Sequence, residues 1–117
     1  AGQRVFLAGG QLRADSGAVL GAAAVAFAEG FRARWGVISV GAVDAGGLMD
    51  YDPEEASFAR AVLAACETRV VVTDSSKFLR RALVGIAPLS GIDLLVTDAA
   101  PPAAVAEGLA RARVIVV

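Results

Sequence analysis

The segment Thr73–Phe78 contains a carboxylate, two adjacent hydroxyls and an ammonium, directly after the apolar run Val70–Val72. That run is typical of a buried strand, and open α/β sheets bind ligands at the carboxyl ends of their strands. Lys77 offers a positive charge and three donors that suit a phosphate oxygen. Asp74 and Ser76 suit sugar hydroxyls, or Lys77 itself. The alternative is a capped strand end with a solvated lysine.

A second candidate cluster follows the apolar run Arg4–Ala8, which is predicted to be a strand. Gly9 and Gly10 end this run, and glycines let a ligand approach the backbone closely. Arg13 comes next and could bind an anion through its guanidinium. The alternative is a tight turn after the strand with a solvated arginine.

Two further clusters lie where a parallel sheet would place its ligand. Gly41 and Asp44 follow the predicted strand 37–40, and Asp44 could accept a ligand hydroxyl or cap its own loop. Glu54 and Glu55 lie in the first turn of a helix that begins at Pro53. Carboxylates there stabilise the helix dipole, so a role for Glu55 in ligand binding needs support from elsewhere.

Composition excludes several classes of function. The 117 residues suit one domain, and 56% hydrophobic content allows a sizeable core. A net charge of −1 gives no electrostatic footprint for nucleic acid. The sequence has no histidine and a single cysteine, Cys66, which excludes histidine-based triads, a zinc knuckle and an internal disulfide. We expect Cys66 to be a core residue, and we expect no metal or cofactor. We also expect a cytoplasmic protein, because no signal-peptide or membrane-spanning pattern is present.

Strand and helix patterns alternate along the chain. Helices are predicted over 18–34, from Pro53 and from Pro101, and strands over 4–8, 37–40, 69–73, 93–97 and 114–117. The segment 79–88 fits either a short edge strand or an apolar loop, and the edge strand is favoured. This alternation predicts an α/β fold with a mostly parallel sheet covered on both faces.

The ordered set of motifs resembles the effector-sensing domain of the DeoR family of bacterial transcriptional repressors. The matching positions run over nearly the whole chain: Gly9, Gly10, Arg13, Gly21-Ala22, Gly41-Ala42, Gly47-Leu48, Asp50, Glu54–Ala56, Asp74–Phe78, Pro88–Ser90, Ile92-Asp93 and Val96–Asp98. The resemblance implies a three-layer, Rossmann-like scaffold similar to ribose-5-phosphate isomerase and the CoA transferases. It also implies a phosphorylated sugar effector that releases the repressor from DNA, and a homo-oligomer.

The expected ligand-binding residues are those of the four clusters: Gly9, Gly10, Arg13, Gly41, Asp44, Glu55, Asp74, Ser76 and Lys77. Residues 1–117 are expected to form one effector-binding domain. Relative to the family, it is expected to lack the first strand-loop-helix unit, with its phosphate loop, and the N-terminal winged helix-turn-helix that binds DNA.

Two alternatives to a sensor remain open at the sequence level. One is an enzyme similar to sugar-phosphate isomerases, with Glu54, Glu55 or Asp74 as base and Lys77 opposite. Of the acidic segment that such isomerases carry after the second strand, only Asp44 remains, so an enzyme is not expected. The other alternative is an oligomerisation domain whose pocket is vestigial.

Overall fold

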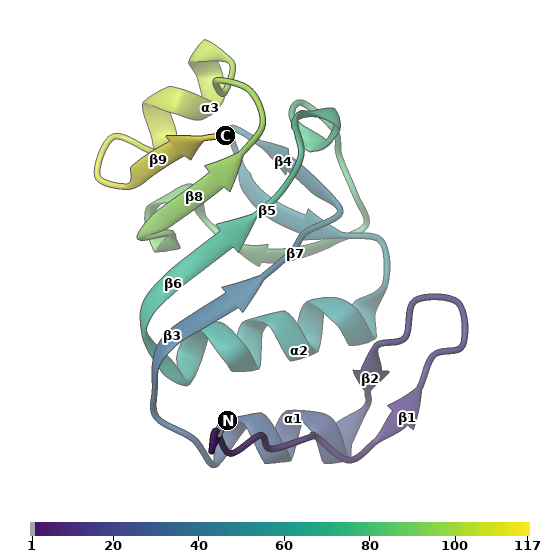
Figure 1. The fold of residues 1–117 in the computed structure, drawn as a ribbon. Coiled ribbons are helices and arrows are strands. Elements are labelled where there is room, and N and C mark those ends of the chain that lie inside the picture. The colour runs from purple at the N-terminus through teal and green to yellow at the C-terminus, as the bar shows by residue number, and fades with distance from the viewer. Residues whose placement is uncertain (1) are drawn as a thin grey trace.

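A four-stranded parallel sheet forms the centre of the computed structural model, which describes residues 2–117 (Figure 1). Its strands lie in the order β3, β6, β8 and β9, and span Ala33–Ile38, Cys66–Val72, Leu94–Thr97 and Arg113–Val116. The register aligns Ile38 with Val71, Val71 with Leu95, and Leu95 with Val114. The predicted parallel sheet and mixed α/β class are therefore confirmed, and β3 begins four residues before the predicted strand.

A separate antiparallel sheet contains β4 (Ala42–Asp44), β5 (Gly47–Asp50) and β7 (Val84–Ala87). The hairpin of β4 and β5 replaces the loop that the sequence suggested after Gly41. Gly47 is needed at its turn, because its φ is 129° and a Cβ atom there would lie 2.4 Å from the Ala87 carbonyl oxygen. The favoured edge strand within 79–88 is confirmed as β7, although it belongs to this second sheet.

Three α-helices and two short 3₁₀ turns complete the fold. The bounds are α1 Ala22–Glu29, α2 Pro53–Ala64, α3 Ala103–Gly108, η1 Ser75–Lys77 and η2 Leu89–Gly91. The predicted start of α2 is confirmed, since Asp52 Oδ1 accepts the Glu54 N–H at 2.8 Å. The helix predicted from Pro101 is confirmed as α3, in which Val105 is buried, and Leu109 is buried directly after it.

The core lies on one face of the parallel sheet. Ile38, Val71 and Leu95 point into it and pack with residues of α2, the antiparallel sheet and α3. Trp35 and Val37 alternate with Gly36 and Ile38 along β3 and are 56% and 60% exposed. In Figure 1 the helix α2 lies behind β3 and β6, and no helix of residues 2–117 lies in front of them. A covering layer on that second face stays a prediction.

The predicted strand over 4–8 is wrong, because residues 4–9 have no regular structure. An apolar run becomes a strand only when a neighbouring strand satisfies its N–H and C=O groups, and no strand of residues 2–117 pairs with it. Val5 and Leu7 are 79% and 85% exposed as a result. The chain instead forms a short antiparallel pair, β1 (Gln11–Leu12) with β2 (Val19–Leu20).

The helix predicted over 18–34 is too long at both ends. Gly21, with φ at 100°, precedes the first helical residue, and Gly30 caps the last turn. Residues on either side join strands β2 and β3, because sheet pairing overrides the helical spacing of the apolar side chains. Cys66 begins β6 and is half-buried against Gly36, where burial raises the pKa of its thiol. No helix of residues 2–117 has the length and apolar character needed to cross a membrane.

Candidate functional site

The Asp74–Lys77 turn lies at the carboxyl end of β6, as the sequence predicted, and forms η1. Asp74 caps this turn, with its Oδ1 accepting the Ser76 N–H at 2.9 Å and also the Ser76 hydroxyl. These two hydrogen bonds hold the pKa of the Asp74 carboxyl below its ordinary value. Asp74 and Ser76 are therefore engaged with each other, and they shape the turn that carries Lys77.

Lys77 is half-buried and forms no salt bridge with any carboxylate of residues 2–117. Its turn is tied to the neighbouring strand β8, because Asp98 Oδ1 accepts the Ser75 N–H at 2.6 Å. Asp98 follows β8 as Asp74 follows β6, so an aspartate after an apolar strand is the sequence signal that marks both positions. The charge of Lys77 helps to lower the pKa of the nearby Asp74 carboxyl, but the two side chains form no salt bridge. A cation that is not ion-paired at the carboxyl edge of a parallel sheet is suited to an anionic ligand.

The hairpin of β4 and β5 brings Asp44 to the same region. The Leu79 N–H donates to the Val43 carbonyl at 2.7 Å, and Phe78 bridges to Val43, so the segment after Lys77 lies along β4. Asp44 Oδ1 accepts the Gly46 N–H at 2.8 Å, and its Oδ2 lies 3.9 Å from Nε of Arg81. The loop cap that was the alternative for Asp44 is thus present.

Gly41 precedes β4 and lies against an aromatic ring. A Cβ atom at this position would be 3.0 Å from Cδ2 of Tyr51. Glycine is also required at position 10 for a structural reason, since its φ is 146° and a Cβ atom would lie 2.6 Å from the Leu20 carbonyl oxygen. Gly9 is exposed, and nothing lies within 4 Å of where its Cβ would be.

Arg13 is engaged by the first turn of α2. Its NH1 lies 2.5 Å from Oδ2 of Asp52, and its NH2 lies 3.5 Å from Oε2 of Glu54. The hydrogen bond to Asp52 raises the pKa of Arg13, and the same contact lowers that of Asp52. Arg13 therefore connects the loop between β1 and β2 to the start of α2, and its charge is already compensated.

Glu55 lies one residue further along α2, beside Asp50. Burial and the neighbouring Asp50 raise the pKa of the Glu55 carboxyl. Both side chains line a cavity of ≈ 240 Å³ between β2, β3 and α2, together with Ser39. Asp50 and Ser39 were not among the predicted site residues, because their proximity to Glu55 arises only from the fold.

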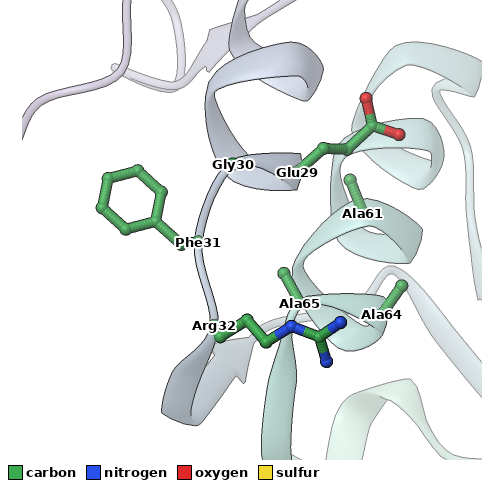
Figure 2. A pocket seen from close by; sticks show the side chains of 7 residues that line it. All are labelled: Glu29, Gly30, Phe31, Arg32, Ala61, Ala64 and Ala65. Atoms are coloured by element: carbon green, nitrogen blue, oxygen red, sulfur yellow. The ribbon is translucent and has the colours of Figure 1, made fainter.

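The structure thus gathers six of the nine predicted residues into two groups, and the three glycines belong to neither. Asp44, Asp74, Ser76 and Lys77 lie around the ends of β4 and β6, while Arg13 and Glu55 lie at the start of α2. A third region is a cavity of ≈ 370 Å³ between the end of α1 and α2, which none of the predicted residues lines. Figure 2 shows Glu29 and Arg32 directed towards the alanines of α2, with the Phe31 ring turned away.

A buried hydroxyl without a partner and the arrangement of possible metal ligands complete the description of the polar groups. Thr97 Oγ1 is buried at the end of β8 without a hydrogen-bond partner among residues 2–117. Within the same range, no group of three histidine, cysteine, aspartate or glutamate residues is arranged to hold a metal ion.

Residues 1–99 match the protein family described as the DeoR C terminal sensor domain. The chain belongs to this family. It is 36% identical to the glycerol-3-phosphate regulon repressor of Escherichia coli over 107 residues, which cover 91% of this chain and 42% of that repressor. The repressor of the same name from Haemophilus influenzae is 39% identical over 98 residues, covering 83% of this chain and 38% of its own length.

A third relative is a putative aga operon transcriptional repressor of Escherichia coli, which is 32% identical over 117 residues. That match covers 99% of this chain and 44% of the relative. The chain therefore spans about two-fifths of the length of these DeoR-type repressors. The family resemblance that the motifs suggested is confirmed.

Proposed function

We propose that this DeoR-type sensor domain binds a small phosphorylated sugar or polyol at the carboxyl edge of its parallel sheet and thereby controls a transcriptional repressor. The observation that carries the proposal is Lys77, a half-buried cation that no carboxylate of residues 2–117 pairs with, held on a capped turn at the end of β6. Two relatives named as glycerol-3-phosphate regulon repressors support an effector that combines a phosphate with hydroxyl groups.

The proposed roles follow from what each side chain already contacts. Lys77 binds the phosphate, and the Ser75 hydroxyl adds a donor beside it, while the Ser76 hydroxyl stays bonded to Asp74 and holds the turn. Asp44 and Asp74 hold the two turns that flank Lys77, and Gly41 keeps the backbone between them accessible. Glu55 accepts hydrogen bonds from effector hydroxyls. Arg13, which follows Gly9 and Gly10, does not bind the effector directly but positions the start of α2 through its salt bridges with Asp52 and Glu54.

The test is an NMR titration of the chain with glycerol 3-phosphate, comparing wild type with Lys77→Ala. A charge-assisted hydrogen bond contributes about 1.5–3 kcal/mol, so we expect the affinity to fall roughly ten- to a hundredfold. Arg80→Ala is the matched control, because Arg80 is an exposed cation three residues away. Equal affinities for wild type and Lys77→Ala would move the phosphate site elsewhere.

The same proposal includes the architecture of the whole regulator. We propose that the exposed face bearing Trp35, Val37 and Val72, together with the open edge of β3, receives a further strand-loop-helix unit and completes a three-layer, Rossmann-like domain. The proposed regulator also has a DNA-binding segment, self-associates into a homo-oligomer, and acts in the cytoplasm without enzymatic activity. Relatives that are repressors of more than twice this length support this part of the proposal.

Tryptophan fluorescence tests the architectural part, because Trp35 is the only tryptophan of the chain. If the proposed unit covers this face, a longer chain that carries it shows a blue-shifted emission and weaker quenching by acrylamide than the 117-residue chain. An unchanged spectrum would leave the face of β3 open to solvent and would contradict the proposed covering layer.

A further inference from the structure

A groove separate from both groups of predicted site residues lies between α2, β6 and the segment from β7 to η2. Its volume is ≈ 520 Å³. Six of the nine residues that line it are apolar or glycine: Leu63, Ala64, Ile86, Ala87, Pro88 and Gly91. The three polar ones are Arg60, Arg69 and Ser90, and none of the nine is acidic. A mostly apolar wall with a few polar groups is typical of a small-molecule site.

Arg60 brings a guanidinium to this groove from α2. Its NH1 donates to the Gly85 carbonyl at 2.5 Å, which holds the side chain against β7. The carbonyl is a neutral acceptor, and no carboxylate of residues 2–117 forms a salt bridge with Arg60. The charge of Arg60 is therefore uncompensated, and its other N–H groups remain available as donors.

Arg69 brings a second guanidinium to the groove from β6. Its backbone N–H donates to Oδ2 of Asp93 at 2.8 Å, and its Nε lies 3.1 Å from the same oxygen. The backbone bond and then the side-chain bond lower the pKa of the Asp93 carboxyl. Within residues 2–117, NH1 and NH2 of Arg69 have no acceptor. The contact with Asp93 thus orients the guanidinium and leaves its two terminal nitrogens as donors.

The balance of charge distinguishes this groove from the surroundings of Arg13. Both terminal nitrogens of Arg13 contact carboxylates, so that side chain has no charge to offer. In the groove, Asp93 compensates the charge of Arg69 alone, and it does not line the groove itself. The groove therefore favours an anion, and a single carboxylate can accept hydrogen bonds from both guanidinium groups.

We propose that this groove binds an organic anion composed of one carboxylate and a short apolar chain. The carboxylate accepts hydrogen bonds from Arg60 and Arg69, and the chain packs against Leu63 and Ile86. The inference goes beyond the proposed function and does not depend on it. Asp93 precedes β8, so the groove lies towards the amino edge of the parallel sheet, whereas the proposed phosphate site lies at the carboxyl edge.

The experiment is a set of NMR titrations of the ¹⁵N-labelled chain with hexanoate, hexan-1-ol and inorganic phosphate. Hexanoate is expected to shift the amide signals of Arg60, Leu63, Arg69 and Gly91. Hexan-1-ol has the same carbon chain without the charge, and inorganic phosphate has a charge without the chain. Both are expected to shift these four signals less than hexanoate does at the same concentration.

Each part of the proposal has its own contradicting outcome. An equal response of the four signals to hexan-1-ol would overturn the carboxylate, and an equal response to inorganic phosphate would overturn the apolar chain. No response to hexanoate would overturn the whole assignment. A response around Lys77 to inorganic phosphate concerns the proposed function alone, because that residue lies at the other edge of the sheet.

Substitutions provide a second test. Arg60→Gln should weaken hexanoate binding about tenfold, because it removes a charged donor. Arg60 is exposed, so the fold is expected to remain intact, which a ¹⁵N spectrum checks. Arg111→Gln is the matched control, since Arg111 is an exposed arginine outside this groove. An equal effect of both substitutions would indicate a general charge effect and overturn the assignment.

Arg69→Gln tests the second guanidinium independently of the first. The backbone N–H of residue 69 still donates to Asp93 in this variant, so the junction between β6 and β8 keeps one of its two bonds. Hexanoate binding should again weaken about tenfold. Unchanged affinity in both Arg60→Gln and Arg69→Gln would show that the arginines do not bind the carboxylate.

Discussion

The two faces of the parallel sheet are built from the same strands but have opposite environments. Val71 and Leu95 are 0% and 1% exposed on the face that packs against the rest of the molecule. Trp35 and Val72 are 56% and 45% exposed on the other face, although they are equally apolar. The difference teaches that a sheet face is buried throughout only where a second layer covers it, and residues 2–117 provide that layer on one side only (Figure 1), although Val70 on the open face is 6% exposed.

Among variants that are expected to fold, the largest effect comes from truncating a side chain of the buried face. Leu95→Ala should lower the free energy of unfolding by about 3 kcal/mol, because it leaves a cavity in a packed core. Val72→Ala should cost less than about 1 kcal/mol, since water already contacts much of that side chain. Urea denaturation of both variants measures the difference. Similar losses for the two would mean that the exposed face is covered in solution.

A pair of threonine substitutions sharpens the comparison. Thr97→Val should raise the free energy of unfolding by about 1 kcal/mol, because it replaces a buried hydroxyl without a partner by an isosteric methyl group. Thr68→Val on the open face should have a smaller effect, since Thr68 is only half-buried and its hydroxyl is not a buried group without a partner. The measurement is again urea denaturation. A loss of stability in Thr97→Val would indicate that an ordered water or a ligand bonds to this hydroxyl.

Glu55 lies by the β3 edge where the two faces meet, in a cavity lined by both Val37 and Ile38. Its raised pKa means that the native state binds this proton more tightly than the unfolded state does. Ionised Glu55 therefore costs stability at neutral pH, and Glu55→Gln should give a gain smaller than that of Thr97→Val.

The pH dependence identifies the cause of that gain. It should shrink as the pH falls through the raised native pKa towards the unfolded one, because wild-type Glu55 then also becomes neutral. Asp52 shows the opposite sign, since its lowered pKa makes the native state favour the ionised form. Thermal melts of Glu55→Gln and wild type from neutral to acidic pH provide the test. A gain that does not depend on pH would exclude electrostatics as its origin.

The smallest expected effect is that of a charge on the open face. Val37→Lys should change the free energy of unfolding by no more than about 0.5 kcal/mol, because the side chain is 60% exposed. Ile38→Lys, one residue along the same strand, should prevent folding by placing a charge in the core. Circular dichroism melts compare the two. A strong loss in Val37→Lys would show that another chain covers this face in solution.

Much of the fold was predictable because it depends on local chemistry. The start of α2 follows from Asp52 and Pro53, which cap a helix whatever surrounds it. The strands that became β6 and β8 are apolar runs bounded by polar turns, and each is followed by an aspartate. The position of the Asp74–Lys77 turn at the carboxyl edge follows directly from that order.

The failures have non-local causes. The run Arg4–Ala8 has the composition of a strand, yet it has no partner strand within residues 2–117. The antiparallel hairpin after Gly41 was not predicted, because its pairing with Val84–Ala87 joins residues 34 to 39 positions apart in the chain, from Asp50 with Val84 to Leu48 with Ala87. Arg13 was predicted as a free anion ligand, and only the fold brings Asp52 and Glu54 within reach of its guanidinium.

The sequence by itself determined the family, the alternation of strands and helices, and the polar residues that follow the strands, since these depend on residue order and short-range preferences. The tertiary structure decided which of those residues are free to bind. It left Lys77 without a carboxylate partner, engaged Arg13 with α2, and joined Asp50 and Ser39 to Glu55 around one cavity. The reason is physical: a side chain's charge state and free donors or acceptors are set by neighbours that are distant in sequence.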